Sequence, residues 1–457
     1  MNLFLPSDPR PLHFVGIGGA GMSALAAIAL KRGLMVSGSD MDASGCGELA
    51  AQGAQIFQGH HEANVGEARA VIVSAAIPQG HVEVEAARAR GIPVIPRKEA
   101  LAGLIGRARC VAIAGTHGKT TTTAMTTEAV AAAGFAVTGL AGGRVDAWGG
   151  NARLGGDDLF VVEADEYDQA FLTLHPTIAV VNNVEADHLE CYGSLDALEG
   201  AFVTFAARAD RVLVGNDSSG AERVAGRLPQ ERVWRFGPGA MPLGLNAIDT
   251  TPEGTSALLT LPGGVALPLR VRVPGVHNLR NASAAVGVVV ALGGRPEPAL
   301  EALANFRGVG RRFDRLGEFG GVAIVDDYAH HPTELRVTLA ATRQAYPGRR
   351  LVALFQPHLY SRTREHHEAM GQALAMADLA IVTDVYPSRE QPIPGITGAL
   401  VAEAVRRHEG QVIYEPVREA LAERVAEQLR SGDVLLTLGA GDINRVSLEV
   451  SDLVGAP

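Results

Sequence analysis

Residues 110–123 constrain the fold of this chain more than any other segment. They read CVAIAGTHGKTTTT: an apolar run, a turn bounded by Gly115 and Gly118, and then Lys119 and Thr120 at the start of an alanine-rich stretch. A strand that enters a glycine turn and leaves as a helix presents backbone N–H groups to phosphate oxygens. The lysine then meets the terminal phosphates and the threonine hydroxyl reaches Mg²⁺. The segment therefore predicts a nucleotide-triphosphate site on an α/β sheet.

This phosphate loop departs from the general pattern at one position, because Ile113 stands where a glycine is expected five residues before Gly118. We therefore interpret the loop as a shortened variant. The residues predicted to contact the nucleotide are Gly115, Thr116, His117, Gly118, Lys119, Thr120 and Thr121.

Length and composition set the broad class. A chain of 457 residues favours about three domains. A net charge of −10 argues against a general nucleic-acid binder. The three cysteines fall in no disulfide or zinc-finger spacing. Because no apolar run approaches the ~20 residues of a membrane span, we expect a cytoplasmic protein without membrane insertion.

Apolar runs that alternate with helix-like segments predict an α/β fold with three domains. The first domain, residues 1–106, is expected to be Rossmann-like. The second, residues 107–308, carries the phosphate loop, and its β-rich stretch 212–275 predicts an antiparallel extension and hence a mixed sheet. Residues 305–320 are interpreted as a junction. The third domain, residues 309–457, is again Rossmann-like.

A second glycine turn, Gly16-Ile-Gly18-Gly-Ala20-Gly21, follows the first predicted strand, and Asp40 lies nineteen residues beyond it. Such glycines allow close approach to a diphosphate, and the aspartate can accept a hydrogen bond from a ribose hydroxyl. A nucleotide-diphosphate sugar satisfies this pattern as well as a nicotinamide dinucleotide does. An oxidoreductase would leave the phosphate loop unexplained, and a turn without any ligand stays an alternative.

Two polar segments follow strands of the second domain. Residues 163–168 read EADEYD and residues 182–188 read NNVEADH. Carboxylates at the carboxyl ends of such strands suit Mg²⁺, so we expect Thr120, Glu163 and His188 to place the metal. The alternatives are a solvated acidic loop and a core or capping histidine.

Further candidates lie near the end of the second domain. Asn278 and Asn281 are three residues apart and can share a helix face that reads adenine or ribose, although Asn278 could instead cap the helix. Arg311 and Arg312 are suited to neutralising a transferring phosphoryl group, with a solvated basic turn as the alternative.

The third domain has two polar strand ends. Residues 326–333 read DDYAHHPT and contain Asp326, His330 and His331, while residues 356–364 contain Arg362 and Arg364. These side chains handle carboxylates and protons, which predicts a second reactant beside the nucleotide.

Together these segments resemble the Mur ligases, ATP-dependent amide-forming enzymes of peptidoglycan precursor synthesis. The resemblance spans residues 16–441 and rests on AGTHGKTTTT, EADE, EADH, GRRFD, DDYAHHPTE and FQPH…RTR in this order. One residue departs from the pattern: Tyr167 stands where serine occurs in many members that add L-alanine, and a tyrosine there also resembles the branch that recycles a murein tripeptide.

The resemblance implies that ATP phosphorylates the lactoyl carboxylate of UDP-N-acetylmuramate and that L-alanine attacks the acyl phosphate. It implies Lys119 and His188 at the phosphates and the Mg²⁺, Arg311 or Arg312 at the phosphoryl group, and Asp326 at ribose. His330, His331 and Arg362 would grip alanine, with Arg364 nearby, and Gly16, Gly18, Ala20, Gly21 and Asp40 would take the UDP portion. The tripeptide, glycine or serine as acceptor, the identity of the base, the oligomeric state, a second metal site and feedback control stay open.

Overall fold

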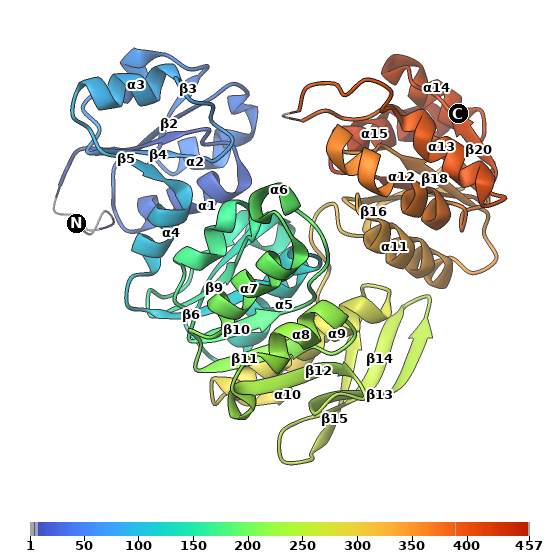
Figure 1. Ribbon diagram of the computed structural model, residues 1–457, viewed down its shortest axis with the longest axis horizontal. Helices are drawn as coiled ribbons and strands as arrows, with labels where there is room; N and C mark the ends of the chain where they lie inside the picture. The colour runs from blue at the N-terminus through green and yellow to red at the C-terminus, as the bar shows by residue number, and fades with distance from the viewer. Residues whose placement is uncertain (1–3, 5–7, 389, 456–457) are drawn as a thin grey trace. The chain divides into compact units, whose positions relative to one another are not determined.

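The computed structural model describes residue 4, residues 8–388 and residues 390–455 (Figure 1). The chain divides into two compact units. The first comprises the chain up to Ala247 together with Ala257–Leu269 and Arg280–Asn305; the second comprises Ile248–Ser256, Arg270–Leu279 and the chain from Phe306 onward. The predicted domain limits at 106/107 and 308/309 stay predictions, and the outer limits 1 and 457 lie outside the described residues.

The N-terminal domain is a five-stranded parallel sheet in the order β3-β2-β1-β4-β5. Its strands are β1 (Leu12–Val15), β2 (Val36–Asp40), β3 (Gln55–Gln58), β4 (Ala70–Val73) and β5 (Val94–Pro96). Its helices are α1 (Ala20–Lys31), α2 (Gly47–Ala51), α3 (Val82–Ala89) and α4 (Arg97–Ile105). Strand β1 is fully buried, as expected for the centre of a parallel sheet covered on both faces. The Rossmann-like prediction is confirmed.

A ten-stranded sheet carries the phosphate loop, in the order β15-β14-β13-β12-β11-β10-β6-β9-β7-β8. Its strands are β6 (Arg109–Ala114), β7 (Thr138–Val145), β8 (Gly150–Arg153), β9 (Leu159–Glu163), β10 (Ile178–Val181), β11 (Arg211–Gly215), β12 (Val233–Pro238), β13 (Pro242–Thr251), β14 (Gly254–Thr260) and β15 (Ala266–Val271). Parallel pairs flank β6, whereas β7 and β8 are antiparallel. The predicted mixed sheet is therefore confirmed, but the antiparallel extension predicted over 212–275 was wrong in part, because β12 pairs parallel with both β11 and β13.

Six helices accompany this sheet: α5 (Lys119–Ala132), α6 (Leu189–Tyr192), α7 (Leu195–Ala206), α8 (Ser219–Gly226), α9 (Val276–Ala291) and α10 (Pro296–Ala304). Helix α5 follows the phosphate loop and packs against α10, β7 and β9. Its ten buried residues make it a core helix, which fixes the loop at its N-terminus.

The C-terminal sheet has the order β16-β17-β21-β18-β19-β20. Its strands are β16 (Asp314–Phe319), β17 (Val322–Asp327), β18 (Leu351–Phe355), β19 (Leu379–Val382), β20 (Val412–Tyr414) and β21 (Val434–Leu438). Its helices are α11 (Pro332–Ala345), α12 (Tyr360–Leu374), α13 (Gly398–Arg407), α14 (Leu421–Ala426) and α15 (Ile443–Gly455). All neighbours are parallel except β16, which pairs antiparallel with β17.

One assignment was wrong: part of the junction predicted at 305–320 is strand β16. Its residues are half-buried or exposed, because an edge strand that pairs with β17 on one side lacks the apolar run of a central strand. Among the described residues, no helix is long and apolar enough to cross a membrane.

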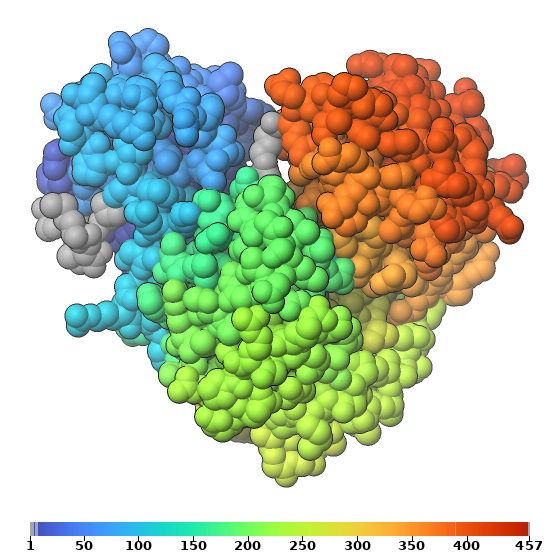
Figure 2. All heavy atoms as spheres, in the orientation of Figure 1, coloured from blue at the N-terminus to red at the C-terminus, as the bar shows by residue number. Residues whose placement is uncertain are grey.

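The N-terminal and central domains belong to the same unit and pack against each other, as the blue and green-cyan atoms of Figure 2 show. Lys31 Nζ donates to the carbonyl of Gly155 at 2.6 Å, and Lys98 Nζ lies 2.8 Å from the carboxylate of Asp168. These contacts hold the first glycine turn near the central sheet.

Candidate active site

The phosphate loop lies between the buried strand β6 and helix α5, as predicted. Gly115 and Gly118 have φ angles of +136° and +77°, in the region that favours glycine. The loop is also bound to the segment after β10: the N–H of Thr116 donates to the carbonyl of Asn183 at 3.1 Å, and the N–H of His117 donates to Asn183 Oδ1 at 2.7 Å. These contacts fix the phosphate loop against the segment after β10.

Lys119 is held by an ion pair that the sequence did not assign. Its Nζ lies 2.8 Å from a carboxylate oxygen of Glu166, and it also donates to the carbonyls of Gly115 and Thr116 at 2.7 and 3.2 Å. The side chains of Lys119 and Glu166 are 14% and 3% exposed. Burial by itself would lower the pKa of Lys119, but the carboxylates of Glu166, Asp165 and Glu163 raise it on balance. The ammonium therefore stays charged and faces carboxylates where ATP phosphates are predicted.

Glu163 ends strand β9 and faces a cavity. Its Oε2 accepts a hydrogen bond from the N–H of Gly142 at 2.6 Å. A Cβ at Gly142 would lie 2.6 Å from the Glu163 carboxylate, so a larger residue there would displace this side chain. The neighbouring cavity of about 290 Å³ is lined by both domains, including Gly19, Ala20, Gly21, Arg97, Glu163 and Asp165. The first glycine turn and the Glu163 carboxylate, which was predicted to bind metal, thus share one cavity.

The carboxylate of Asp40 accepts hydrogen bonds from backbone N–H groups in and near the first glycine turn. Its Oδ2 accepts from the N–H of Gly18 at 2.9 Å, and its Oδ1 accepts from the N–H of Asp42 at 3.1 Å. Gly16 has a φ of +78°. The predicted partners of the UDP portion, Gly16, Gly18, Ala20, Gly21 and Asp40, are therefore brought together at the ends of β1 and β2.

The remaining predicted residues of the central domain differ in their surroundings. Thr120 and Thr121 are buried in the first turn of α5. Asn281 is buried beside Gly118, and its Oδ1 has no hydrogen-bond partner. Asn278, in contrast, donates its Nδ2 to the carbonyl of Pro274 at 2.8 Å. His188 has a left-handed φ of +54° and makes an edge-to-face contact with Tyr167.

In the second unit, Arg311 acts as a tether. Its Nε donates to Asp326 Oδ2 at 3.1 Å, and its two terminal nitrogens donate to the carbonyls of Gly441 and Gly439 at 3.1 and 2.7 Å. Asp326 also accepts from the Thr437 hydroxyl at 2.8 Å. Burial raises the pKa of Asp326 despite the opposing effect of Arg311. These two predicted residues thus bind the ends of β17 and β21 together.

The guanidinium groups of both arginines lie over the ring of Tyr328, that of Arg311 at 5.1 Å and that of Arg312 at 4.9 Å. The adjacent Asp327 accepts from the N–H groups of Phe313 and Ala329 at 2.7 and 2.8 Å. Burial raises the pKa of Asp327 to about 6, although Arg312 opposes this shift. Because the guanidinium of Arg311 is already bound to Asp326 and to two carbonyls, Arg312 is the better candidate to meet a phosphoryl group.

The two adjacent histidines, His330 and His331, make different hydrogen bonds and therefore have different roles. His330 Nδ1 lies 3.0 Å from the carbonyl of Tyr328, which can only accept, so Nδ1 carries the proton and a neutral ring has its lone pair on Nε2. His331 is the N-cap of α11: its Nδ1 accepts from the N–H of Thr333, and Glu334 completes the capping box. His330 is therefore the better candidate for a base and His331 for a structural cap.

The two predicted arginines of α12 also differ. Arg362 is buried in the first turn of the helix, with a terminal nitrogen 3.3 Å from His358 Nδ1. The ring of His358 is stacked on Tyr386 with centroids 5.8 Å apart. Arg364 is exposed. A carboxylate ligand is expected to meet Arg362 before Arg364.

Sequence reasoning missed two residues of this site. Glu166 was part of the acidic segment, but its pairing with Lys119 follows from the fold of the loop after β9. Arg97, the first residue of α4, lines the cavity, and its guanidinium lies 3.8 Å from Asp165. A Cβ at Gly21 would lie 2.7 Å from the same guanidinium. In the sequence, Arg97 is marked only as a basic residue that follows a predicted strand.

Comparison with known proteins places this geometry in context. The sequence matches three family profiles: "Mur ligase family, catalytic domain" over residues 11–109, "Mur ligase middle domain" over 113–289, and "Mur ligase, glutamate ligase domain" over 311–441. A UDP-N-acetylmuramate–L-alanine ligase of Clavibacter michiganensis subsp. michiganensis is 43% identical over 455 residues, covering 98% of this chain and 94% of the relative. One from Acidithiobacillus ferrooxidans is 42% identical, with 98% of each chain covered.

Solved structures agree in fold. The UDP-N-acetylmuramate-alanine ligase of Thermotoga maritima has a TM-score of 0.84 and 29% identity, with 97% of this chain and 98% of that chain covered. A murein peptide ligase of Psychrobacter arcticus has a TM-score of 0.73 and 22% identity, with 98% and 99% covered.

Proposed function

Because this chain belongs to the Mur ligase family, we propose that it uses ATP to join L-alanine to the lactoyl carboxylate of UDP-N-acetylmuramate, a step of peptidoglycan precursor synthesis. The observation that carries this proposal is the 42–43% identity, over nearly the full chain, with proteins of that activity. The phosphate loop and the cavity beside it supply the matching geometry.

The first step activates a poor electrophile. A carboxylate repels an amine, whereas an acyl phosphate has a good leaving group. Transfer of the γ-phosphoryl group to the lactoyl oxygen needs positioning and charge neutralisation rather than covalent catalysis. When ATP binds, the ammonium of Lys119 would leave the carboxylate of Glu166 and contact the β- and γ-phosphates instead. Thr120 and Glu163 offer hard oxygen ligands and His188 an imidazole, a set that fits Mg²⁺ bound to phosphates. The ion would neutralise charge on the transferring group.

The cavity between the domains would receive the muramoyl group. Gly18, Ala20 and Gly21 would hold the diphosphate while Asp40 contacts the ribose of UDP. Arg97 reaches the same cavity and carries a positive charge, so it is suited to orient the lactoyl carboxylate toward the phosphoryl donor. We therefore add Arg97 to the predicted substrate-binding residues.

The second step requires a neutral amine. Arg362 would bind the carboxylate of L-alanine, and His330, with its lone pair on Nε2, would accept the ammonium proton. Attack on the acyl carbon gives a tetrahedral intermediate that expels phosphate. Arg312 would neutralise the phosphoryl group. Asn281 would contact adenine, and Asp326, with Arg311 bound to it, the ATP ribose.

A phosphate-release assay tests the proposal directly. The purified chain is incubated with ATP, Mg²⁺ and UDP-N-acetylmuramate, and with L-alanine, glycine, L-serine or the murein tripeptide as acceptor. Release that depends on L-alanine is expected. The second candidate is the tripeptide-recycling activity, which Tyr167 favours; release that depends on the tripeptide alone would establish it and reject the first.

A further inference from the structure

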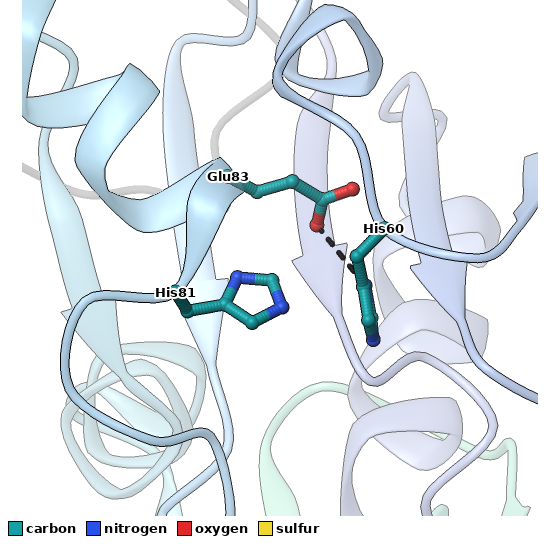
Figure 3. A group of neighbouring side chains, drawn as sticks. All are labelled: His60, His81 and Glu83. Carbon is teal, nitrogen blue, oxygen red and sulfur yellow. Dashed lines mark ion pairs between the residues drawn. The ribbon is translucent and has the colours of Figure 1, made fainter.

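The N-terminal domain contains a histidine–glutamate cluster that the proposed reaction does not use. His60 follows β3, His81 precedes α3, and Glu83 lies in the first turn of α3. One ligand atom from each lies within 4.8 Å of those of the other two. Figure 3 shows the two rings and the carboxylate converging on the same space.

The ring of His81 packs edge-to-face on that of His60, with centroids 4.5 Å apart, but its nitrogens are not used in this contact. Both of its ring nitrogens are buried without a hydrogen-bond partner among the residues that the structure describes. It occupies the N-cap of α3, yet its side chain makes no capping hydrogen bond. By contrast, His61 and His331 occupy N-caps and their rings accept from Ala63 N and Thr333 N. A buried donor or acceptor without a partner is destabilising, so these orphaned nitrogens point to a ligand.

Glu83 is the buried carboxyl group of the cluster. Its side chain is fully buried, and its Oε2 accepts from the Ser39 hydroxyl at 2.6 Å while its Oε1 accepts from Asn64 Nδ2 at 2.7 Å. His13 Nε2 lies 3.6 Å from Oε2. Glu83 Oε1 also accepts from the N–H of His61 at 3.2 Å. These contacts hold the carboxylate in place beside the two rings.

The spacing of the cluster suits a small cation. His60 Nδ1 lies 3.4 Å from Glu83 Oε2. Ligand atoms at 2.0–2.1 Å from a tetrahedral zinc ion lie about 3.3 Å apart, so this pair has a similar separation. His60 Nδ1 also lies 3.0 Å from Ser39 Oγ, and a metal ion bound at Nδ1 would replace this hydrogen bond and its proton. The ligand atom of His81 lies within 4.8 Å of those of His60 and Glu83. The side chain of His60 is 14% exposed, which leaves a path for entry from solvent.

We propose that His60, His81 and Glu83 form a binding site for a borderline-soft divalent transition metal of the Zn²⁺ class. Two imidazoles and one carboxylate favour such an ion over Mg²⁺, which prefers oxygen ligands. The site belongs to the N-terminal domain and is separate from the Mg²⁺ ligands proposed in the central domain. It depends on no step of the proposed ligase reaction.

The test measures zinc stoichiometry on the full chain. The protein is stripped with a chelator, dialysed against Zn²⁺ in excess Mg²⁺, and analysed by elemental mass spectrometry and calorimetric titration. The wild type is expected to bind one more zinc ion per chain than His81→Ala. His175→Ala, which removes an exposed histidine elsewhere, should bind as the wild type does.

The variant is chosen to fold, because removing the His81 ring breaks no hydrogen bond. If it nevertheless fails to fold, His60→Ala replaces it. Co²⁺ should give the visible absorption of a four-coordinate site in the wild type and lose it in the variant. Equal zinc content and equal Co²⁺ spectra for the wild type and both variants would overturn the proposal.

Discussion

The two glycine turns of the first unit share a local design but differ in how charge is balanced within them. Both connect a buried parallel strand to a helix. At the first turn an internal carboxylate, that of Asp40, accepts from a backbone N–H where a phosphate oxygen could bind. At the second, the carboxylate of Glu166 pairs with the lysine that would bind phosphate. The first turn is therefore closed by an exposed hydrogen bond, and the second by a buried ion pair whose charges depend on each other.

Among the changes that test this difference, removing Glu166 should have the largest effect, measured on the free energy of unfolding. Glu166→Ala leaves the buried ammonium of Lys119 without its counter-ion, which costs about 3–5 kcal/mol of stability. An ATP analogue with Mg²⁺ should restore part of the loss, because phosphate oxygens replace the carboxylate. Denaturant titration with and without the analogue measures both. Asp168→Ala, which breaks the half-exposed pair with Lys98, is the control and should cost less than about 1 kcal/mol. Equal losses would mean that burial of the Lys119 pair has no energetic consequence.

Lys119→Ala should lower kcat by about two decades or more, by analogy with the loss of one preorganised electrostatic group. Phosphate release at saturating substrates measures this. Lys31→Ala, which loses only a hydrogen bond to the Gly155 carbonyl, should retain nearly full activity. Near-normal turnover of Lys119→Ala would reject the phosphate-loop assignment.

The backbones of the two turns can be compared by adding one methyl group to each. A Cβ at Gly115 would meet the backbone nitrogens of Asn182 and Asn183 at 3.1 Å, whereas a Cβ at Gly16 would meet nothing nearer than 3.7 Å. Both positions have a positive φ, which costs an L-residue about 1–2 kcal/mol. Gly115→Ala is therefore expected to destabilise the protein more than Gly16→Ala in thermal unfolding. The reverse order would show that the loop shifts freely away from Asn182.

Asp40→Asn should give the smallest effect, confined to the first turn. An amide has one acceptor oxygen for the two N–H groups that Asp40 now serves, so the turn loses one charge-assisted hydrogen bond. We expect KM for UDP-N-acetylmuramate to rise about tenfold, equivalent to about 1.4 kcal/mol, with kcat and KM for ATP unchanged. A change in KM for ATP would indicate that the two turns are coupled.

The sequence predicted what is local and missed what depends on tertiary contacts. Strands β6 and β9 lie where their apolar runs predicted them, because glycine turns and buried strands leave a pattern within a few residues. The partner of Lys119 left no such pattern. Which carboxylate of residues 163–166 meets the lysine depends on the path of the chain after β9, where Asp168 and Gln169 both adopt left-handed conformations.

Arg97 and strand β16 were missed for a similar reason. Arg97 contributes to the cavity because the N-terminal and central domains pack together, which the sequence around it does not encode. Strand β16 pairs at the edge of its sheet and lacks an apolar run. The contrasting roles of His330 and His331 depend on one carbonyl and one helix N-terminus, which only the structure places.

The cavity between Gly21 and Glu163 has a thermodynamic consequence for the whole first unit. A ligand that fills it touches both domains at once, so neither can unfold without losing that ligand. In calorimetry, the N-terminal and central domains should then melt as one cooperative transition at saturating nucleotide sugar, even if they separate into two in its absence.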